Sequence, residues 1–211
     1  MKQILTLCYS IFLITTSFGQ LTALTNNGDE VILNTDGTWK YLNRSPQNQN
    51  RIDTNKVKIS KSAVSSFIVK SSKINCGIYI DPKKWSFAKG DDGEASEFEF
   101  TLKGKDAYAM IIAEKTEIPI ETLKVIAIEN AKAVAPDITI TKEEYRKVND
   151  NLVLLMQMNG SVKGIKLTYL AYYFSSPEGS VQLVTYSATN LFNAYKNDME
   201  EFLNGFVSNR N

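Results

Sequence analysis

The C-terminal part of the chain constrains the fold most strongly, because four β-prone segments follow one another there with only short turns between them. We expect strands over residues 138–147, 151–158, 165–174 and 181–188. The turns contain residue types that favour chain reversal, namely Asn149-Asp150, Asn159-Gly160 and Pro177-Glu178-Gly179. Strands joined by connections this short lie antiparallel to their neighbours. The sequence therefore predicts four consecutive strands of one antiparallel sheet.

Two amphipathic segments on either side of these strands predict helices. Residues 120–135 carry apolar side chains at three- and four-residue spacing, and Pro119 suits the first turn of a helix that Pro136 ends. Residues 190–206 carry a continuous apolar stripe. Both faces of the strand over 165–174 become apolar toward its C-terminal half, which predicts a strand covered on both sides. The expected fold class is α+β, an antiparallel sheet flanked by helices.

The region before the first helix adds further β-prone segments. Residues 77–80 predict a strand, and residues 97–102 and 107–114 predict a hairpin around Lys103-Gly104-Lys105. We assign residues 74–207 to one folded domain and residues 208–211 to a tail.

The first 19 residues are typical of a secretory signal peptide. Lys2 precedes an apolar run over residues 4–14, and Ser17 and Gly19 are small residues placed for a cut before Gln20. A transmembrane anchor, the alternative, needs about 20 apolar residues. The segment 1–19 therefore predicts export and a periplasmic or secreted protein.

Two segments connect the signal peptide to the domain. Residues 20–42 contain the turn-forming pairs Asn27-Gly28 and Asp36-Gly37 between short β-prone runs, which predicts a small three-stranded β meander. Residues 43–73 are polar and rich in basic residues, which is typical of a flexible linker. A basic arm for anionic surfaces is the alternative, and residues 65–70 could add a strand.

The absence of histidine limits the chemistry available to this chain. It excludes Ser-His-Asp and Cys-His catalysis and every histidine-containing metal site. After loss of residues 1–19, Cys76 is the single cysteine, so an internal disulfide is excluded. Loss of Lys2 from 24 basic and 23 acidic residues leaves 23 of each, so no net charge attracts nucleic acid. We expect a non-catalytic protein without cofactor or metal.

Aromatic residues supply the candidate binding sites. Trp39 and Tyr41 share one face of a short strand in a module with little interior, so they form either a partner-binding patch or a contact with the main domain. Tyr172 and Phe174 could line a cavity for an apolar ligand together with Phe202, although core packing explains them equally well. The same choice between groove and core applies to the neighbouring tyrosines Tyr169, Tyr173 and Tyr186.

Acidic residues offer weaker candidates. Asp91-Asp92-Gly93-Glu94, followed by Glu97 and Glu99, could supply oxygen ligands to calcium, but it lacks the spacing of an EF-hand loop and also suits a solvated hairpin tip. Glu143 and Glu144 are adjacent in a predicted strand and point to opposite faces. They therefore cannot converge on one substrate atom as an acid–base pair.

The order of elements resembles the PsbP-like superfamily, which includes photosystem extrinsic proteins, DcrB-type lipoproteins and Mog proteins. The resemblance covers residues 74–207 and includes Gly77-Ile78-Tyr79-Ile80-x-Pro82-x-x-Trp85, the strand that leads into a Pro-led helix, and the aromatic C-terminal helix. The segment ending in Asp36-Gly37-Thr38-Trp39-x-Tyr41 resembles N-terminal β modules of exported proteins of Bacteroidetes-type bacteria.

This resemblance implies an antiparallel sheet flanked by helices that is used for binding or assembly. We expect an exported, non-catalytic protein of the cell envelope that binds a protein or another envelope component. Two alternatives remain: a carrier of a small apolar ligand, and a hydrolase that works with carboxylates.

Overall fold

The computed structural model describes residues 21–24, 30–35, 37–41 and 52–208. The chain divides into two compact units, residues 1–51 and 52–211, and each is described by itself below. The predicted signal peptide, the Asn27-Gly28 turn and residues 43–51 of the predicted linker lie outside the described residues.

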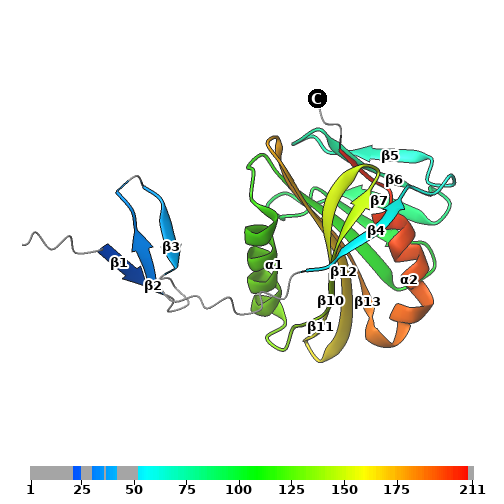
Figure 1. Cartoon of the computed structure of the whole chain (residues 1–211). Coiled ribbons are helices and arrows are strands. Elements are labelled where there is room, and N and C mark those ends of the chain that lie inside the picture. The colour runs from blue at the N-terminus through cyan, green and yellow to red at the C-terminus, as the bar shows by residue number, and fades with distance from the viewer. Residues whose placement is uncertain (1–20, 25–29, 36, 42–51, 209–211) are drawn as a thin grey trace, which may run out of the picture. The chain divides into compact units, whose positions relative to one another are not determined.

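The first unit contains the predicted β meander (Figure 1). Its strands are β1 (Leu21–Leu24), β2 (Glu30–Leu33) and β3 (Trp39–Tyr41), in the order β1-β2-β3. Both pairs of neighbours are antiparallel. At the turn before β3, Gly37 has a φ of 83°, and its backbone N–H donates to the carbonyl oxygen of Asn34 at 3.2 Å. Glycine adopts this positive φ without a steric penalty.

The second unit is built on an eight-stranded sheet in the order β4-β10-β11-β12-β13-β9-β8-β7. Every neighbouring pair is antiparallel except β4 and β10, which are parallel. The strands are β4 (Thr54–Ile59), β7 (Trp85–Lys89), β8 (Phe98–Leu102), β9 (Ala107–Glu114), β10 (Thr139–Val148), β11 (Asn151–Val162), β12 (Ile165–Ser176) and β13 (Gly179–Ala188). The four consecutive strands β10 to β13 confirm the predicted antiparallel sheet.

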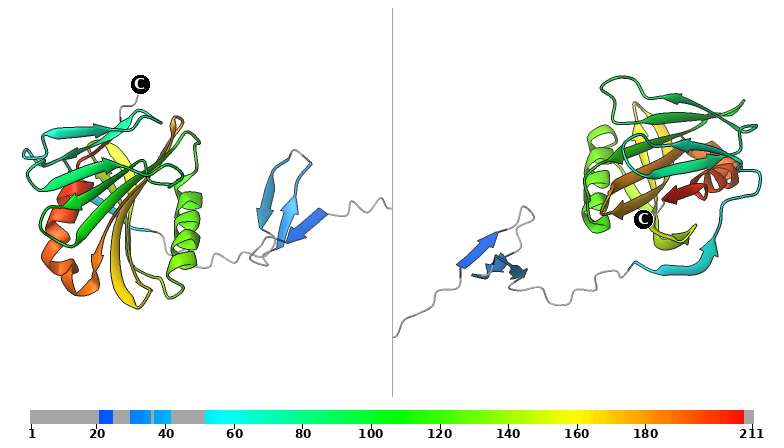
Figure 2. Two further views of the ribbon diagram at one scale, coloured as in Figure 1. Left: turned by 180° about the vertical axis from the view of Figure 1, so that it is seen from behind. Right: turned by 90° about the horizontal axis from the view of Figure 1, so that it is seen from above.

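Different elements cover the two faces of this sheet (Figures 1 and 2). Helix α2 (Thr189–Leu203) and a three-stranded sheet of order β14-β6-β5 cover one face. Helix α1 (Ile120–Val134) covers part of the other face. The strands of the small sheet are β5 (Phe67–Lys70), β6 (Cys76–Ile80) and β14 (Phe206–Ser208). The unit is therefore an α+β sandwich, as predicted.

Each face has its own hydrophobic core. The larger core, on the α2 side, contains Trp85 and Phe100, whose rings both pack on Phe202 of α2 with centroids 4.6 and 4.9 Å away. The smaller core, under α1, joins Leu123 and Ala127 of the helix to side chains of β11 and β12. Residues 170–174 of β12 are all buried, so both faces of the strand are covered there, as predicted for its C-terminal half.

Three sequence-based boundaries differ from the structure. Within the predicted linker 43–73, residues 54–59 form a strand, and the second unit begins at Ile52 rather than residue 74. Strand β5 lies within residues 65–70, where the sequence allowed a strand. The last helix ends at Leu203, and β14 follows it and reaches into the predicted tail. The Asn159-Gly160 pair lies inside β11, and the chain reverses instead at Lys163 and Gly164, which have φ angles of 50° and 81°. Strand β7 was not predicted from the sequence.

Candidate binding surfaces

A row of apolar side chains crosses the meander from one edge to the other. Leu21 of β1 lies opposite Leu33 of β2, and Leu33 lies opposite Trp39 of β3, so all three share one face. Their exposed fractions are 66%, 38% and 54%. This row contains Trp39, one of the residues that the sequence suggested for binding.

The register also assigns Tyr41 to the face that carries this row. Tyr41 lies opposite Val31, two residues along β3 from Trp39, and side chains two residues apart in a strand share a face. The side chain of Tyr41 lies outside the described residues. Lys40, between the two aromatic residues, belongs to the opposite face of the meander.

Tyr172 and Phe174, the other two candidate residues, are part of the larger core. Their exposed fractions are 1% and 2%. Phe174 packs against Phe206 of β14, with ring centroids 5.1 Å apart. Phe202, expected to line the same apolar cavity, packs against Trp85 and Phe100. The structure therefore brings these side chains together as tightly packed core residues.

The hydroxyl of Tyr172 belongs to a buried polar network. It donates to Asn204 Oδ1 at 2.7 Å and accepts from Arg146 Nη1 at 3.2 Å. Arg146 Nε also lies 2.5 Å from Glu144 Oε1, an ion pair that is largely buried. Burial alone would raise the pKa of Glu144, but its hydrogen bond to Arg146, aided by Lys142, lowers that pKa overall. The network links β10 and β12 to the end of α2.

On the α1 side of the large sheet, the strands β13, β9, β8 and β7 present a partly exposed face. Along β9, buried residues alternate with partly exposed or exposed ones, namely Tyr108, Met110, Ile112 and Glu114. The strand register places these beside the equivalent side chains of β13 and β8. Within residues 52–208, α1 packs mainly on β12, and its core reaches Val184 of β13 but includes no residue of β9, β8 or β7. We call these α1-side positions of β13, β9, β8 and β7 the open sheet face.

The rings of three tyrosines lie next to one another across the inner part of this face. The ring of Tyr186 (β13) lies 5.5 Å from that of Tyr108 (β9) with a 29° angle between planes, and 5.8 Å from that of Tyr169 (β12). Tyr108 is 37% exposed, and Tyr186 and Tyr169 are half-buried. Burial raises the pKa of Tyr169 and, together with the charge of Glu99, that of Tyr186. The ring of Tyr186 therefore lies between the rings of Tyr108 and Tyr169.

Sequence reasoning grouped Tyr169 and Tyr186 with core residues of the same strands and did not single out Tyr108. The alternation of Ala107, Ala109 and Ile111 with Tyr108 and Met110 was a usable signal, because it places the larger side chains on one face. Which face a helix would cover could not be deduced from that alternation.

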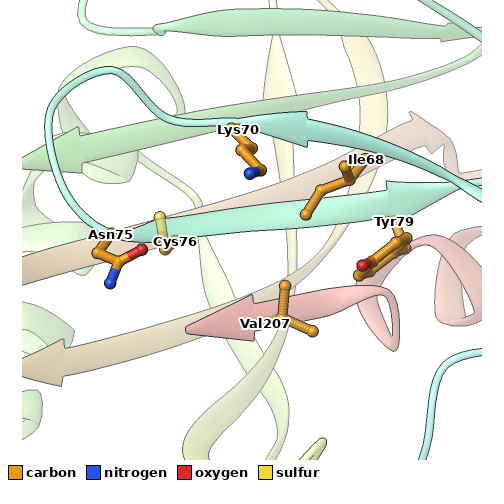
Figure 3. A pocket seen from close by; sticks show the side chains of 6 residues that line it. All are labelled: Ile68, Lys70, Asn75, Cys76, Tyr79 and Val207. Atoms are coloured by element: carbon orange, nitrogen blue, oxygen red, sulfur yellow. The ribbon is translucent and has the colours of Figure 1, made fainter. Parts of the chain in front are cut away.

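A cavity of about 230 Å³ lies on the outer face of the three-stranded sheet (Figure 3). Its lining residues are Ile68, Lys70, Asn75, Cys76, Tyr79 and Val207. Gly77 lies at the centre of this face, where a Cβ atom would approach the carbonyl oxygen of Val69 to 2.9 Å. Burial, with the charge of Glu97, raises the pKa of the Cys76 thiol to about 12. Cys76 is therefore protonated at neutral pH and is not a reactive nucleophile.

The acidic residues that the sequence suggested as a calcium ligand or as an acid–base pair interact with other side chains. Glu97 accepts hydrogen bonds from Ser71 Oγ and from the backbone N–H and hydroxyl of Ser72. Glu143 pairs with Lys124 of α1, whereas Glu144 pairs with Arg146 on the opposite face, as predicted. In the described part of the chain, no three acidic or cysteine side chains form a group that could hold a metal ion. Likewise, none of the described helices is long and apolar enough to cross a membrane.

Comparison with known proteins identifies the fold. No family model and no curated protein sequence matches this chain. Among solved structures, the cyanobacterial PsbP (CyanoP) of Synechocystis sp. PCC 6803 is similar over 68% of this chain and 92% of its own, with a TM-score of 0.53 and 12% identity. The main unit has a PsbP-like fold.

Two further solved structures are similar to this chain. LpqN, described as involved in cell envelope biogenesis of Mycobacterium tuberculosis, aligns over 68% of this chain and 90% of its own, with 9% identity and a TM-score of 0.47. PA94, a Pseudomonas aeruginosa protein of unknown function, aligns over 69% and 98%, with 9% identity and a TM-score of 0.46.

Proposed function

We propose that this protein is an exported, non-catalytic binding protein of the cell envelope, and that its meander contacts a protein or another envelope component. The observation that supports this proposal is the exposed row of Leu21, Leu33 and Trp39 across the meander. Tyr41 belongs to the same face and is part of the proposed contact.

Burial of this row against a partner would contribute appreciable binding energy. Full burial of a large apolar side chain contributes about 1.5–3 kcal/mol. Tryptophan is also among the residue types that most often dominate the binding energy of protein interfaces. The meander buries Val31 and Ile32 of its central strand, whereas the three side chains of the row stay exposed. A partner surface would supply the burial that the small module lacks.

The absence of histidine and the environment of Cys76 support a non-catalytic role. So does the pairing of Glu143 and Glu144 with different basic residues on opposite faces of β10. A carboxylate-based hydrolase would need two carboxyl groups about 5–9.5 Å apart in one cleft.

The proposed contact can be tested by affinity capture from an envelope extract with the mature protein as bait. Captured proteins would be identified by mass spectrometry, purified and titrated against the bait. We expect Trp39→Ala to weaken binding of the identified partner at least about tenfold, and Trp39→Ala/Tyr41→Ala to abolish it. Lys40→Ala, on the opposite face of the same strand, is the matched control and should bind like wild type. Equal binding by all four proteins would overturn the proposal.

Export can be tested separately. The full-length chain would be expressed in a bacterium with a cell envelope, and the N-terminus of the recovered protein determined. The proposal expects a chain that starts at Gln20 in the periplasmic or extracellular fraction. Recovery of the uncleaved chain from the cytoplasm would contradict it.

A further inference from the structure

We propose that the open sheet face and the adjacent side of α1 form a docking site for an amphipathic α-helix of a partner protein, with basic residues along one side of that helix. This surface belongs to the PsbP-like domain and is separate from the meander row. The proposal therefore goes beyond the contact proposed above and can fail independently of it.

The floor of the site is apolar where it adjoins α1. Val184 of β13 and Met110 of β9 lie opposite each other in the register, beside the stacked pair Tyr186 and Tyr108. All four point to the α1 side, and none is fully buried. An antiparallel sheet can expose one face to water, but such a face usually carries polar side chains. Here these four positions are aromatic or aliphatic instead, although Val184 also packs against the core under α1 and the next α1-side residue of β13, Gln182, is polar.

The polar contacts of α1 fix which side of the helix faces this floor. Glu121 accepts a hydrogen bond from Tyr145 of β10, and Lys124 pairs with Glu143 of the same strand. That side of the helix therefore lies over β10. The opposite side of α1 lies toward β13, because β13 is on the other side of β11 and β12 in the sheet.

This opposite side of α1 provides the wall of the site. Ile126, Asn130 and Ala133 are spaced by four and three residues, so they lie along one line of the helix. All three are exposed. Ile126 adds apolar surface next to the floor. The short side chains of Asn130 and Ala133 leave room for a second helix to approach closely.

The dimensions of the face fit one helix beside α1. Neighbouring strands lie about 4.8 Å apart. Packed helices lie about 8–10 Å apart, and the spacing depends on the side chains at the contact. Because α1 lies over β11 and β12, a second helix at that spacing would lie over β13 and β9. That is where the tyrosines and Met110 are placed, so the second helix would complete the outer layer of the sandwich.

The charge of the face indicates the character of the partner helix. The charged side chains at α1-side positions of β13, β9 and β8 are Glu99 and Glu114, and these positions carry no basic residue. Glu99 on β8 lies beyond the apolar floor as seen from α1, and Glu114 lies at the end of β9. A helix that packed its apolar side on the floor would bring its far side near Glu99. Basic residues there would be favoured, because opposite charges complement one another across an interface.

The test uses the mature protein and labelled synthetic peptides of about 18 residues, long enough to form a helix. The first peptide has leucine on one helical side and lysine elsewhere. The second has glutamate in place of lysine. The third has the composition of the first with leucine and lysine alternating, which is the pattern of a strand. Binding is measured by fluorescence polarisation at low and moderate salt. We expect only the first peptide to bind measurably, and more weakly as salt increases.

Matched variants locate the binding. We expect Ile126→Lys on α1 and Met110→Lys on β9 to weaken binding about tenfold each, since each loses apolar contact and adds a positive charge. Val125→Lys makes nearly the same change one residue earlier in α1, at an exposed position a helical step of about 100° away from Ile126, so it should bind within about twofold of wild type. Both α1 variants replace an exposed β-branched residue with a better helix former, so the fold is retained. Trp39→Ala should leave peptide binding unchanged.

Several outcomes would overturn the proposal. The first is no binding of the helical basic peptide. Equal binding of the strand-patterned or acidic peptide is the second, because it indicates a nonspecific apolar surface or a different partner. A third is an equal effect of Val125→Lys and Ile126→Lys. The fourth is Ile126-dependent binding to phosphatidylglycerol vesicles without peptide binding, which would assign the face to a membrane surface.

Discussion

The hydroxyl of Tyr172 in β12 donates a hydrogen bond of 2.7 Å to the side-chain oxygen of Asn204, immediately after α2. The same hydroxyl accepts a hydrogen bond from the buried guanidinium of Arg146. A residue chosen from the sequence as a possible ligand contact thus connects the sheet to the end of the last helix. We therefore expect the Tyr172 hydroxyl to contribute to the free energy of unfolding.

We expect Tyr172→Phe to lower the free energy of unfolding by about 1–3 kcal/mol, because buried Arg146 and partly buried Asn204 each lose a hydrogen bond. Urea denaturation followed by circular dichroism would measure the change. Tyr169→Phe is the control, because its half-buried ring keeps its packing on Tyr186, and a change below about 0.5 kcal/mol is expected. Equal effects of the two substitutions would contradict the proposed role of the network.

Asn149 offers a second test of the same region. Its side-chain N–H groups donate to the carbonyl oxygens of Asn204 and Phe206 at 2.8 and 2.7 Å, and its Oδ1 accepts from the backbone of Lys61. Asn149→Asp keeps the shape but points a carboxylate at two carbonyl oxygens. We expect a loss of on the order of 3 kcal/mol at neutral pH, measured by urea denaturation.

The neighbouring residue provides the matched control for that substitution. Asp150 has a similar positive φ, 66° against 44° for Asn149, and its side chain is 82% exposed. Asp150→Asn should change stability by less than about 0.5 kcal/mol, because its ion pairs are exposed. The loss of stability caused by Asn149→Asp should also become smaller at acidic pH, because the introduced carboxyl group takes up a proton there.

The ion pair of Glu144 predicts a pH dependence of stability. Its folded-state pKa lies below the unfolded-state value of about 4.3, so its stabilising contribution is complete above that value. The contribution is lost as the pH falls through the lower folded-state pKa. We expect Glu144→Gln to cost about 2 kcal/mol at pH 7 and much less near pH 3. Glu129→Gln, at an exposed position of α1, should show no such difference. If the stability loss of the two variants changed with pH in the same way, the proposed role of the Glu144 ion pair would be wrong.

Cys76 should resist alkylation in the native protein. With a pKa of about 12, its thiolate fraction at pH 8 is on the order of 10⁻⁴, and the side chain is also buried. Iodoacetamide labelling followed by intact-mass spectrometry should show almost no adduct until urea unfolds the domain. Rapid labelling of the native protein, at a rate close to that of the unfolded protein, would show that the thiol is accessible.

The sequence predicted the second unit well where the apolar pattern was strong. Strand β9 and the starts of α1, β11 and β12 agree with the structure, because alternation and helical spacing are local signals. The Asn159-Gly160 pair misled the turn assignment. Gly160 instead permits close packing, since a Cβ atom there would approach Ile138 Cδ1 to 2.8 Å. That requirement depends on a residue 22 positions away in the chain and has no local signal.

The strands at the sheet edges were harder to predict. β4 and β5 are short, and β4 is rich in lysine, so their composition resembled that of a linker. Edge strands often carry lysine because charge discourages pairing with other chains. For the candidate sites, Trp39 could be selected because its module is small. Tyr108 could not, because its exposure depends on how far α1 extends across the sheet.

The parallel pairing of β4 with β10 has a mechanical consequence. A pull on the chain before Ile52, directed along β4, would act on the hydrogen bonds between the two strands together, as sliding, instead of opening them one after another. Lys61, just beyond β4, is bonded to Asn149, which also holds the segment after α2. Tension on the N-terminal part would therefore be transmitted toward the C-terminal end of the folded chain.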